Sequence, residues 1–216
     1  MDVSQQTGEV GFSVRPLLIA ANWKMYKTPA EAVAFIEAFR AIDVGDGDGV
    51  ETLLFPAMTS LPSVTEAARG TRLEIGAQDM HWLDEGAYTG ETSPTMLLAL
   101  GCTHVLIGHS ERRRYFNETD ETVNRKLLSA LVHGLIPVVC VGETKAERAG
   151  GATAAVLARQ VSAALRGVDV SGSDSLIFAY EPLWAIGDGI SAAPPVTEDA
   201  HTRIRADVAS VLGAER

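Results

Sequence analysis

The chain has 216 residues, of which 46% are hydrophobic and 21% are charged, and its formal net charge at pH 7 is −10. A chain of this length can bury one large core or two small ones, and the composition is that of an ordinary globular protein. The negative charge argues against nucleic acid and anionic membranes as main partners. It does not exclude a small anionic substrate, because the binding of such a ligand depends on the local field.

The amino-terminal residues and the cysteines give expectations about location. Residues 1–15, "MDVSQQTGEVGFSVR", have neither a basic start nor an apolar core, so we expect a flexible leader and not a signal peptide. No apolar run approaches the length that spans a membrane. Cys102 and Cys140 lie in apolar surroundings without metal-ligand spacing, which predicts two reduced, buried thiols in a cytoplasmic protein.

Six short apolar or β-branched runs recur along the chain, each near the usual length of a strand. In chain order they are "PLLIAANW", "ETLLFP", "LEIGAQ", "THVLIGH", "IPVVCVG" and "SLIFAYE". Several lack the alternation of polar and apolar residues that a half-exposed strand needs. This pattern is typical of strands buried on both faces of a parallel sheet.

Helices are predicted between these strands. The stretch "TPAEAVAFIEAF" has Thr28 as N-cap, Pro29 at the first helical position and Glu31 to complete a capping box. The stretch "TDETVNRKLLSALVHG" has acidic residues in its first turn, which predicts a helix that starts at Thr119 and stops at Gly134.

Two further helices complete the alternation of strands and helices. "ATAAVLARQVSAALRG" is expected to stop at Gly167, and "TEDAHTRIRADVASVLG" to begin at Thr197. Repeated strand-then-helix units predict right-handed βαβ crossovers around a parallel sheet, as in α/β proteins. We find no linker or repeat and therefore expect residues 16–216 to form a single domain; the alternation alone leaves open whether its sheet is closed.

Polar residues stand at the carboxyl ends of the predicted strands, where both kinds of parallel-sheet protein have their active sites. They are Asn22, Lys24, Gln78, Asp79, His109, Ser110, Glu111, Glu143 and Glu181. Each alone is more often structural or solvated, but an Asn, a Lys, a His and a Glu together can perform acid–base chemistry on an oxyanion. No Cys/His or carboxylate cluster suggests a metal, so we expect none.

The stretch "AYEPLWAIGDG" ends an apolar run on Glu181 and continues with Pro182, an apolar loop and two glycines. Taken alone, it predicts a strand end and an ordinary turn. Beside the other polar strand ends, it indicates a catalytic base under a mobile cover. The sequence has no GxGxxG or GxxxxGK[ST] loop after the first strand and no GxSxG elbow, which counts against nucleotide-binding folds and α/β-hydrolases.

Five motifs together resemble the triosephosphate isomerase family, in the family's order and at the ends of successive strands. They are "AANWKMYKT", "GAYTGETSPTML", "LIGHSERRRYF", "IPVVCVGET" and "AYEPLWAIGDG", and the resemblance runs from about Pro16 to the last residue. It implies a TIM (β/α)8 barrel and a cofactor-free aldose–ketose isomerase of glycolysis and gluconeogenesis. Such an enzyme interconverts glyceraldehyde 3-phosphate and dihydroxyacetone phosphate through an enediolate.

The resemblance also implies roles for individual residues. Glu181 would be the base, His109 the neutral electrophile and Lys24 the cationic stabiliser. Asn22 would sit beside Lys24 in the substrate pocket, and Glu111 would pair with Lys24 in the empty site.

Two loops take further roles by resemblance. Residues 182–190 look like a lid, with the Gly187 amide contacting the substrate phosphate. "DEGAYTGETSP" resembles the loop by which one subunit reaches into its neighbour, so that Thr89 would approach the Lys24 region of the partner subunit in a homodimer.

The sequence departs from the family pattern in two motifs. The lid reads "GDGI" where a Thr and a Lys are usual, and "DMHW" replaces an Asn-containing stretch. The sister group of erythrulose-phosphate isomerases resembles "MHW" and "GAYTGE" well and would use the same chemistry on a four-carbon sugar phosphate. The triose substrate stays the first interpretation, because the motif set is generic to the superfamily.

The family also continues with two more βα units, which include a Gly-Gly-Ser segment that grips the phosphate, and we find neither unit. We therefore expect about six βα units, from a truncated gene model or a genuine short variant, and doubtful activity for the chain as given. A second alternative function is an inactive barrel fragment that acts as a binding or assembly module.

Overall fold

The computed structural model describes most of the chain. The described residues are 17–42, 49–169, 176–187, 189 and 191–213. The predicted leader, residues 1–15, lies outside these ranges, as do Asp188 and Ile190 of the predicted lid.

Six strands form one parallel sheet in the order β1-β2-β3-β4-β5-β6. They are β1 (Leu17–Asn22), β2 (Val50–Phe55), β3 (Leu73–Ala77), β4 (His104–Ile107), β5 (Ile136–Val141) and β6 (Ile177–Tyr180). Each strand therefore pairs with its neighbour in the sequence, and all six predicted strands are confirmed. Because the strands are parallel, their carboxyl ends lie along one edge of the sheet.

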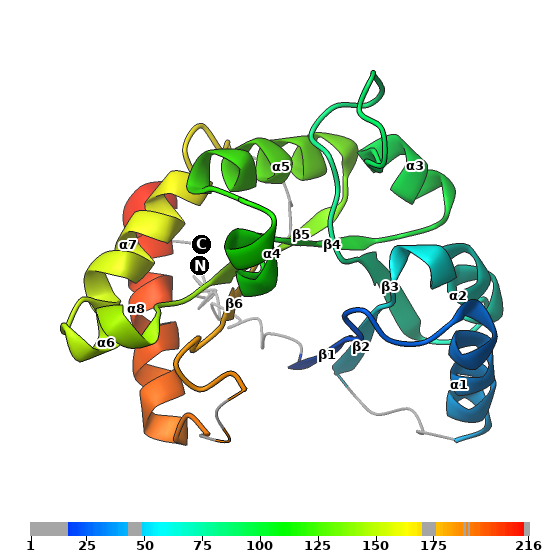
Figure 1. The fold of residues 1–216 in the computed structure, drawn as a ribbon, viewed down its shortest axis with the longest axis horizontal. Coiled ribbons are helices and arrows are strands. Elements are labelled where there is room, and N and C mark those ends of the chain that lie inside the picture. The colour runs from blue at the N-terminus through cyan, green and yellow to red at the C-terminus, as the bar shows by residue number, and fades with distance from the viewer. Residues whose placement is uncertain (1–16, 43–48, 170–175, 188, 190, 214–216) are drawn as a thin grey trace, which may run out of the picture.

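Eight α-helices alternate with the strands in the described chain, and most of them lie around the outer side of the curled sheet, as Figure 1 shows. They are α1 (Pro29–Ala41), α2 (Leu61–Ala67), α3 (Pro94–Ala99), α4 (Ser110–Tyr115), α5 (Asp120–His133), α6 (Lys145–Ala149), α7 (Thr153–Ala164) and α8 (Pro194–Leu212), with a 3-10 turn, η1 (Met58–Ser60), before α2. The described chain thus forms six βα units of a partial TIM barrel, as predicted.

The predicted signals at helix ends are largely confirmed. Thr28 forms the capping box of α1 with Glu31, and α1 begins at Pro29. Helix α5 has Thr119 as its N-cap, and it is followed by Gly134 in the left-handed conformation with φ 76°.

Two predicted helix ends were wrong. Helix α7 ends at Ala164, and the chain reaches Gly167 through a turn. Helix α8 begins at Pro194 and not at Thr197. The fixed φ of proline suits the first helical turn, and no hydrogen bond is lost there because the N–H groups of that turn have no partner within the helix.

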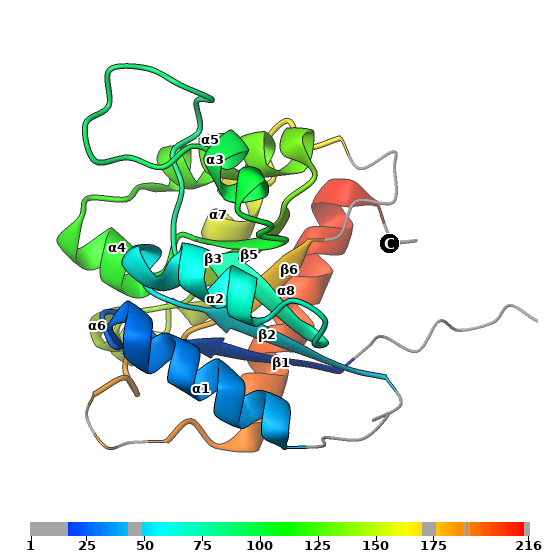
Figure 2. The ribbon, with the colours of Figure 1, turned by 90° about the vertical axis from the view of Figure 1, so that its right-hand side faces the viewer.

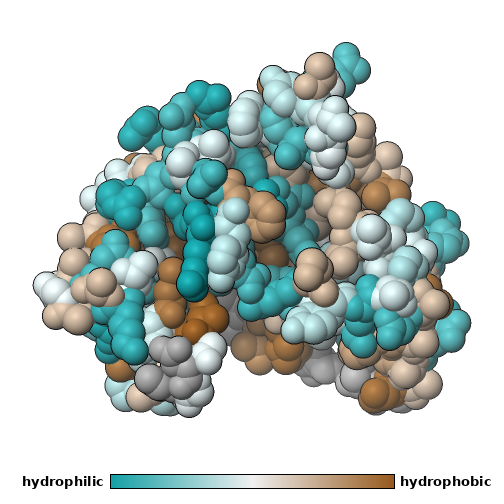
Figure 3. Space-filling view, viewed as in Figure 1, coloured by the Kyte–Doolittle hydropathy of each residue, from teal (hydrophilic) through white to brown (hydrophobic). Residues whose placement is uncertain are grey.

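Apolar side chains fill both faces of the sheet. The helix-covered face includes Val105, Ile107, Val139 and Val141, which pack against helix residues such as Leu127 and Leu157. The concave face is lined by Leu53, Phe55, Leu106, Val138 and Cys140. Apolar surface is visible in the notch on this side in Figure 3.

Other findings bear on the chemistry of the chain. Cys102 and Cys140 are free and buried, as predicted. Burial raises the pKa of the Cys102 thiol to about 12, so this thiol stays protonated at neutral pH. Among the helices of the described residues, none is long and apolar enough to cross a membrane.

Candidate active site

Three elements bring polar side chains to the carboxyl edge of the sheet. Asn22 is the last residue of β1, Glu181 directly follows β6, and His109 follows β4 after one glycine. The Glu181 N–H donates to the carbonyl oxygen of Val141 at 2.8 Å, so the backbone is held to β5 where the side chain begins.

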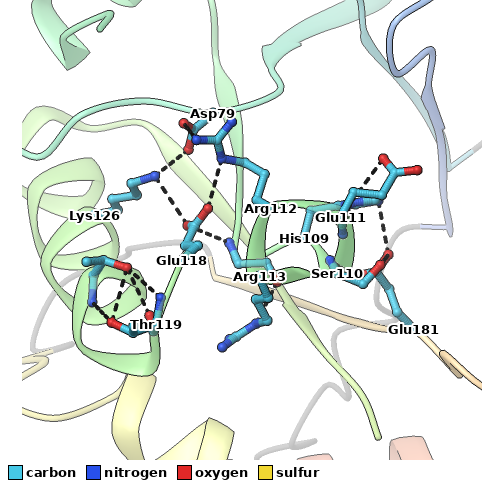
Figure 4. A network of polar contacts seen from close by, with 12 residues as sticks. Asp79, His109, Ser110, Glu111, Arg112, Arg113, Glu118, Thr119, Lys126 and Glu181 are labelled. Carbon is cyan, nitrogen blue, oxygen red and sulfur yellow. Dashed lines mark hydrogen bonds and ion pairs between the residues drawn. The ribbon is translucent and has the colours of Figure 1, made fainter. Parts of the chain in front are cut away.

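The Glu181 carboxylate lies against the first residue of α4. The Ser110 N–H donates to Glu181 Oε2 at 2.9 Å, and the Ser110 hydroxyl donates to Oε1 at 3.1 Å. His109 Nε2 lies 3.0 Å from the same Oε1 (Figure 4). Three donors therefore hold this carboxylate, whose side chain is 15% exposed.

The hydrogen bonds of His109 identify its tautomer. The Glu111 N–H donates to His109 Nδ1 at 3.2 Å, so this nitrogen acts as an acceptor and has no proton. The proton of the neutral ring is then on Nε2, where it can be donated to Glu181. A neutral imidazole with its N–H directed into the site can give a proton to an oxyanion and take it back.

Lys24 has a strained backbone whose N–H and C=O both form hydrogen bonds with side chains. Its φ of 53° lies in the left-handed region, which costs a residue with a Cβ roughly 1–2 kcal/mol. Its N–H donates to Asn22 Oδ1 at 2.8 Å, and Gln78 Nε2 donates to its carbonyl oxygen at 2.8 Å. Its ammonium lies 2.9 Å from Glu111 Oε1, which is the pair that the family resemblance implies. These contacts hold the Lys24 backbone in place, and they leave its ammonium beside the Glu111 carboxylate.

The structure brings together five of the residues predicted for the site, which form a chain of contacts: Asn22, Lys24, Glu111, His109 and Glu181.

Two other predicted residues lie apart from them. Gly187, with φ 85°, is in the loop after β6, and Thr89 is exposed in the long loop between β3 and α3. Within the described residues, neither Gly187 nor Thr89 hydrogen-bonds to the five.

A buried carboxylate that the sequence did not assign anchors the segment after Glu181. Glu143 is fully buried and accepts hydrogen bonds from Tyr180 Oη and Trp184 Nε1, each at 3.0 Å, and from Arg148 Nη1 at 3.3 Å. Burial raises the pKa of Tyr180 to about 12, which keeps its phenol protonated as a donor. The only signal in the sequence was the position of Glu143 at the end of the fifth strand.

The residues "DMHW" begin the long loop between β3 and α3, which projects from the body in Figure 2. The His81 ring lies between the rings of Trp82 and Tyr88, with centroid distances of 4.1 and 4.3 Å. The Arg125 guanidinium of α5 lies 5.5 Å from the Trp82 ring. These aromatic side chains therefore pack within the loop and against α5.

Searched over the described residues alone, the structure contains no group of three or more His, Cys, Asp or Glu side chains that could hold a metal ion. The site itself presents the carboxylate of Glu181, the imidazole of His109 and the ammonium of Lys24.

Comparison with known proteins gives a consistent family match. The family model of triosephosphate isomerase matches residues 17–216. A triosephosphate isomerase of Solibacter usitatus is 48% identical over 202 residues, which cover 94% of this chain and 81% of the relative. The triosephosphate isomerase of Citrifermentans bemidjiense is 46% identical over 93% of this chain and 79% of the relative. That of Geotalea uraniireducens is also 46% identical, over 94% of this chain and 80% of the relative.

Proposed function

The chain belongs to the triosephosphate isomerase family, and from this membership we propose that it interconverts glyceraldehyde 3-phosphate and dihydroxyacetone phosphate in glycolysis and gluconeogenesis. The observation that supports this proposal best is the contact between His109 Nε2 and Glu181 Oε1 at 3.0 Å. A base and a neutral proton donor at this separation can act on neighbouring atoms of one small substrate.

The proposed reaction needs only proton transfers. Glu181 removes a proton from the carbon next to the carbonyl, and the C–H electron pair forms the C=C bond of an enediolate. His109 donates its Nε2 proton to one oxygen and receives the proton of the other. Glu181 then returns its proton to the neighbouring carbon. The ammonium of Lys24 stabilises the negative charge of the enediolate. The Lys24 N–H already occupies Asn22 Oδ1, so Asn22 offers its NH2 group to the substrate.

Two contacts of the described structure must change when substrate binds. The Lys24 ammonium is paired with Glu111, so an anionic substrate replaces or shares that carboxylate. Glu181 is held by both donors of Ser110 and must leave them to reach a carbon atom. We propose that the segment from Pro182 closes over the substrate, excludes water and brings the Gly187 N–H to the phosphate.

We further propose a cytoplasmic homodimer built from residues 16–216 as one domain. Tyr88 in the projecting loop is 47% exposed, and Met25 and Tyr26 after β1 are 93% and 74% exposed. In the proposed dimer these apolar side chains would be covered by the partner subunit. Light scattering of the purified protein tests the dimer.

The competing substrate is an erythrulose phosphate, which the lid sequence "GDGI" and the likeness of "MHW" and "GAYTGE" to the sister group suggest. In the stretch "DMHW", the rings of His81 and Trp82 contact Tyr88 and Arg125, so these side chains pack within the loop and against α5. The triose stays the first proposal because the relatives described above are triosephosphate isomerases.

The test is steady-state kinetics of the purified protein with glyceraldehyde 3-phosphate and with an erythrulose phosphate, beside the variant His109→Gln. We expect a higher kcat/KM for the triose and a large loss of kcat in the variant. A higher kcat/KM for the erythrulose phosphate would favour the sister activity. Binding of a substrate analogue without turnover would favour a binding or assembly module.

A further inference from the structure

The backbone of Gly142, the residue that follows β5, is bound by a buried side chain of α7. The Gly142 N–H donates to Gln160 Oε1 at 2.8 Å, and Gln160 Nε2 donates to the Gly142 carbonyl oxygen at 3.2 Å. Gln160 is only 6% exposed, so both bonds are shielded from water. A carboxamide has a donor and an acceptor side by side, and here each of them is paired with the same residue. Gln160 therefore fixes the backbone of Gly142 relative to α7.

Gly142 in turn lies directly against the backbone of Glu181. The Glu181 N–H donates to the carbonyl oxygen of Val141 at 2.8 Å, so the two chains are already paired one residue earlier. A Cβ on Gly142 would overlap the Glu181 carbonyl oxygen and lie 2.8 Å from its carbonyl carbon. Glycine is required here because another backbone approaches so closely. A shift of Gly142 would therefore move the backbone from which the Glu181 side chain extends.

This backbone support matters most when the Glu181 carboxylate is free. In the described structure the carboxylate is held by both donors of Ser110 and by His109 Nε2. In the proposed reaction it leaves Ser110 to reach a carbon atom of the substrate. The position of the carboxylate then depends on where its own backbone lies, and that backbone rests on Gly142.

We propose that Gln160 is a positioning residue for Glu181, which it places through the backbone of Gly142. The inference rests on the isomerase function proposed above, in which Glu181 must reach a substrate carbon. Gln160 acts from α7 and does not touch the substrate. A displacement of about 1 Å in a catalytic group can lower a rate by about a hundredfold.

The first test compares two substitutions in α7. Gln160→Leu removes both bonds to Gly142 and keeps a side chain of similar size. Leu157→Ala is the matched control, because Leu157 is fully buried in the core and its truncation leaves both bonds to Gly142 in place. We expect both variants to lower the melting temperature. Only Gln160→Leu should lower kcat, by about tenfold to a hundredfold with little change in KM. An equal loss of kcat in the two variants would overturn the proposal.

A second substitution makes the bonds to Gly142 depend on protonation. In Gln160→Glu, a protonated carboxyl group has a donor and an acceptor and can replace the amide, whereas a carboxylate has acceptors only. Burial favours the protonated form in acid. We expect kcat relative to the wild type at the same pH to be close to one in acid and to fall as the carboxyl group ionises. A loss of kcat in acid as large as that of Gln160→Leu would contradict the proposal. This variant also keeps the test available if Gln160→Leu folds poorly.

A measurement without turnover keeps this inference distinct from the proposed function. His109 Nε2 lies 3.0 Å from Glu181 Oε1, so its NMR resonance reports on where the carboxylate lies. The resonance should shift in Gln160→Leu and stay unchanged in Leu157→Ala. If the wild-type protein did not isomerise trioses, the proposed function would fail while the NMR result still tested the positioning. An unchanged His109 Nε2 resonance in Gln160→Leu would refute the positioning, whatever the activity.

Discussion

Shortening Glu181 to aspartate is the sharpest test of its proposed role as the base. The Glu181 carboxylate oxygens lie 2.9 and 3.1 Å from the two donors of Ser110 and 3.0 Å from His109 Nε2. Glu181→Asp withdraws the carboxylate by about one C–C bond, roughly 1.5 Å. All three contacts then exceed the range of a hydrogen bond unless the backbone shifts.

The expected loss follows from this displacement. Misplacement of a catalytic group by about 1 Å costs about a hundredfold in rate, which corresponds to about 2.7 kcal/mol of activation free energy. We therefore expect kcat for glyceraldehyde 3-phosphate to fall by at least about a hundredfold while KM changes little, because in the proposed mechanism Glu181 does not contact the phosphate. Glu66→Asp is a matched control, since Glu66 lies on the surface of α2 with a side chain that is 68% exposed. Near-normal turnover of Glu181→Asp would remove Glu181 from the role of base.

The remaining predictions concern stability and are checked by unfolding experiments. Glu143→Gln should lower the free energy of unfolding in urea by about 1–3 kcal/mol, because charge-assisted hydrogen bonds become neutral ones; an unchanged midpoint would contradict this. Burial raises the pKa of Tyr180 from 10.0 to about 12, so its stabilising contribution is complete below pH 10 and is lost as the pH rises towards 12. Tyr180→Phe should therefore flatten the alkaline decline of the melting temperature, and an equally steep decline would argue against it. Burial lowers the pKa of His104 below 6.5, so the contribution of the neutral imidazole to stability is present above pH 6.5 and is lost as the pH falls through the folded-state pKa. His104→Gln should therefore weaken the decline of the melting temperature in acid. An equally steep decline in both proteins would refute the reasoning.

The sequence predicted the fold well where local chemistry decides it. Strands β4 and β5 are apolar runs that are buried along nearly their whole length, and such runs can be recognised without their neighbours. The expected burial on both faces was wrong for β1, where Leu17 and Ile19 are 61% and 57% exposed. The Thr28 capping box and the Gly134 stop act within one turn of helix, so they too can be read locally. The start of α8 was missed because Pro194 fits a first helical turn as well as a preceding loop.

The candidate site was predicted only in part, for a physical reason. Residues at the ends of parallel strands must share one edge, which is why Lys24, His109 and Glu181 could be grouped from the sequence; their catalytic roles stay predictions. The burial of Glu143 depends on donors that are distant in sequence, such as Trp184, which is 41 positions away. No local pattern distinguishes such a buried carboxylate from a solvated one.

The anchoring of Trp184 by Glu143 has a consequence for substrate affinity. In the proposed mechanism the described conformation and the substrate-bound one are two populations, and the bonds to Trp184 and Glu181 favour the first. The apparent dissociation constant equals the intrinsic one divided by the fraction of molecules that is competent to bind. Once the competent form is rare, each additional ~1.4 kcal/mol of stability that these bonds give to the described conformation weakens the apparent affinity about tenfold. The same bonds re-form when product leaves, so a loosened anchor should retain ligands more tightly and release them more slowly.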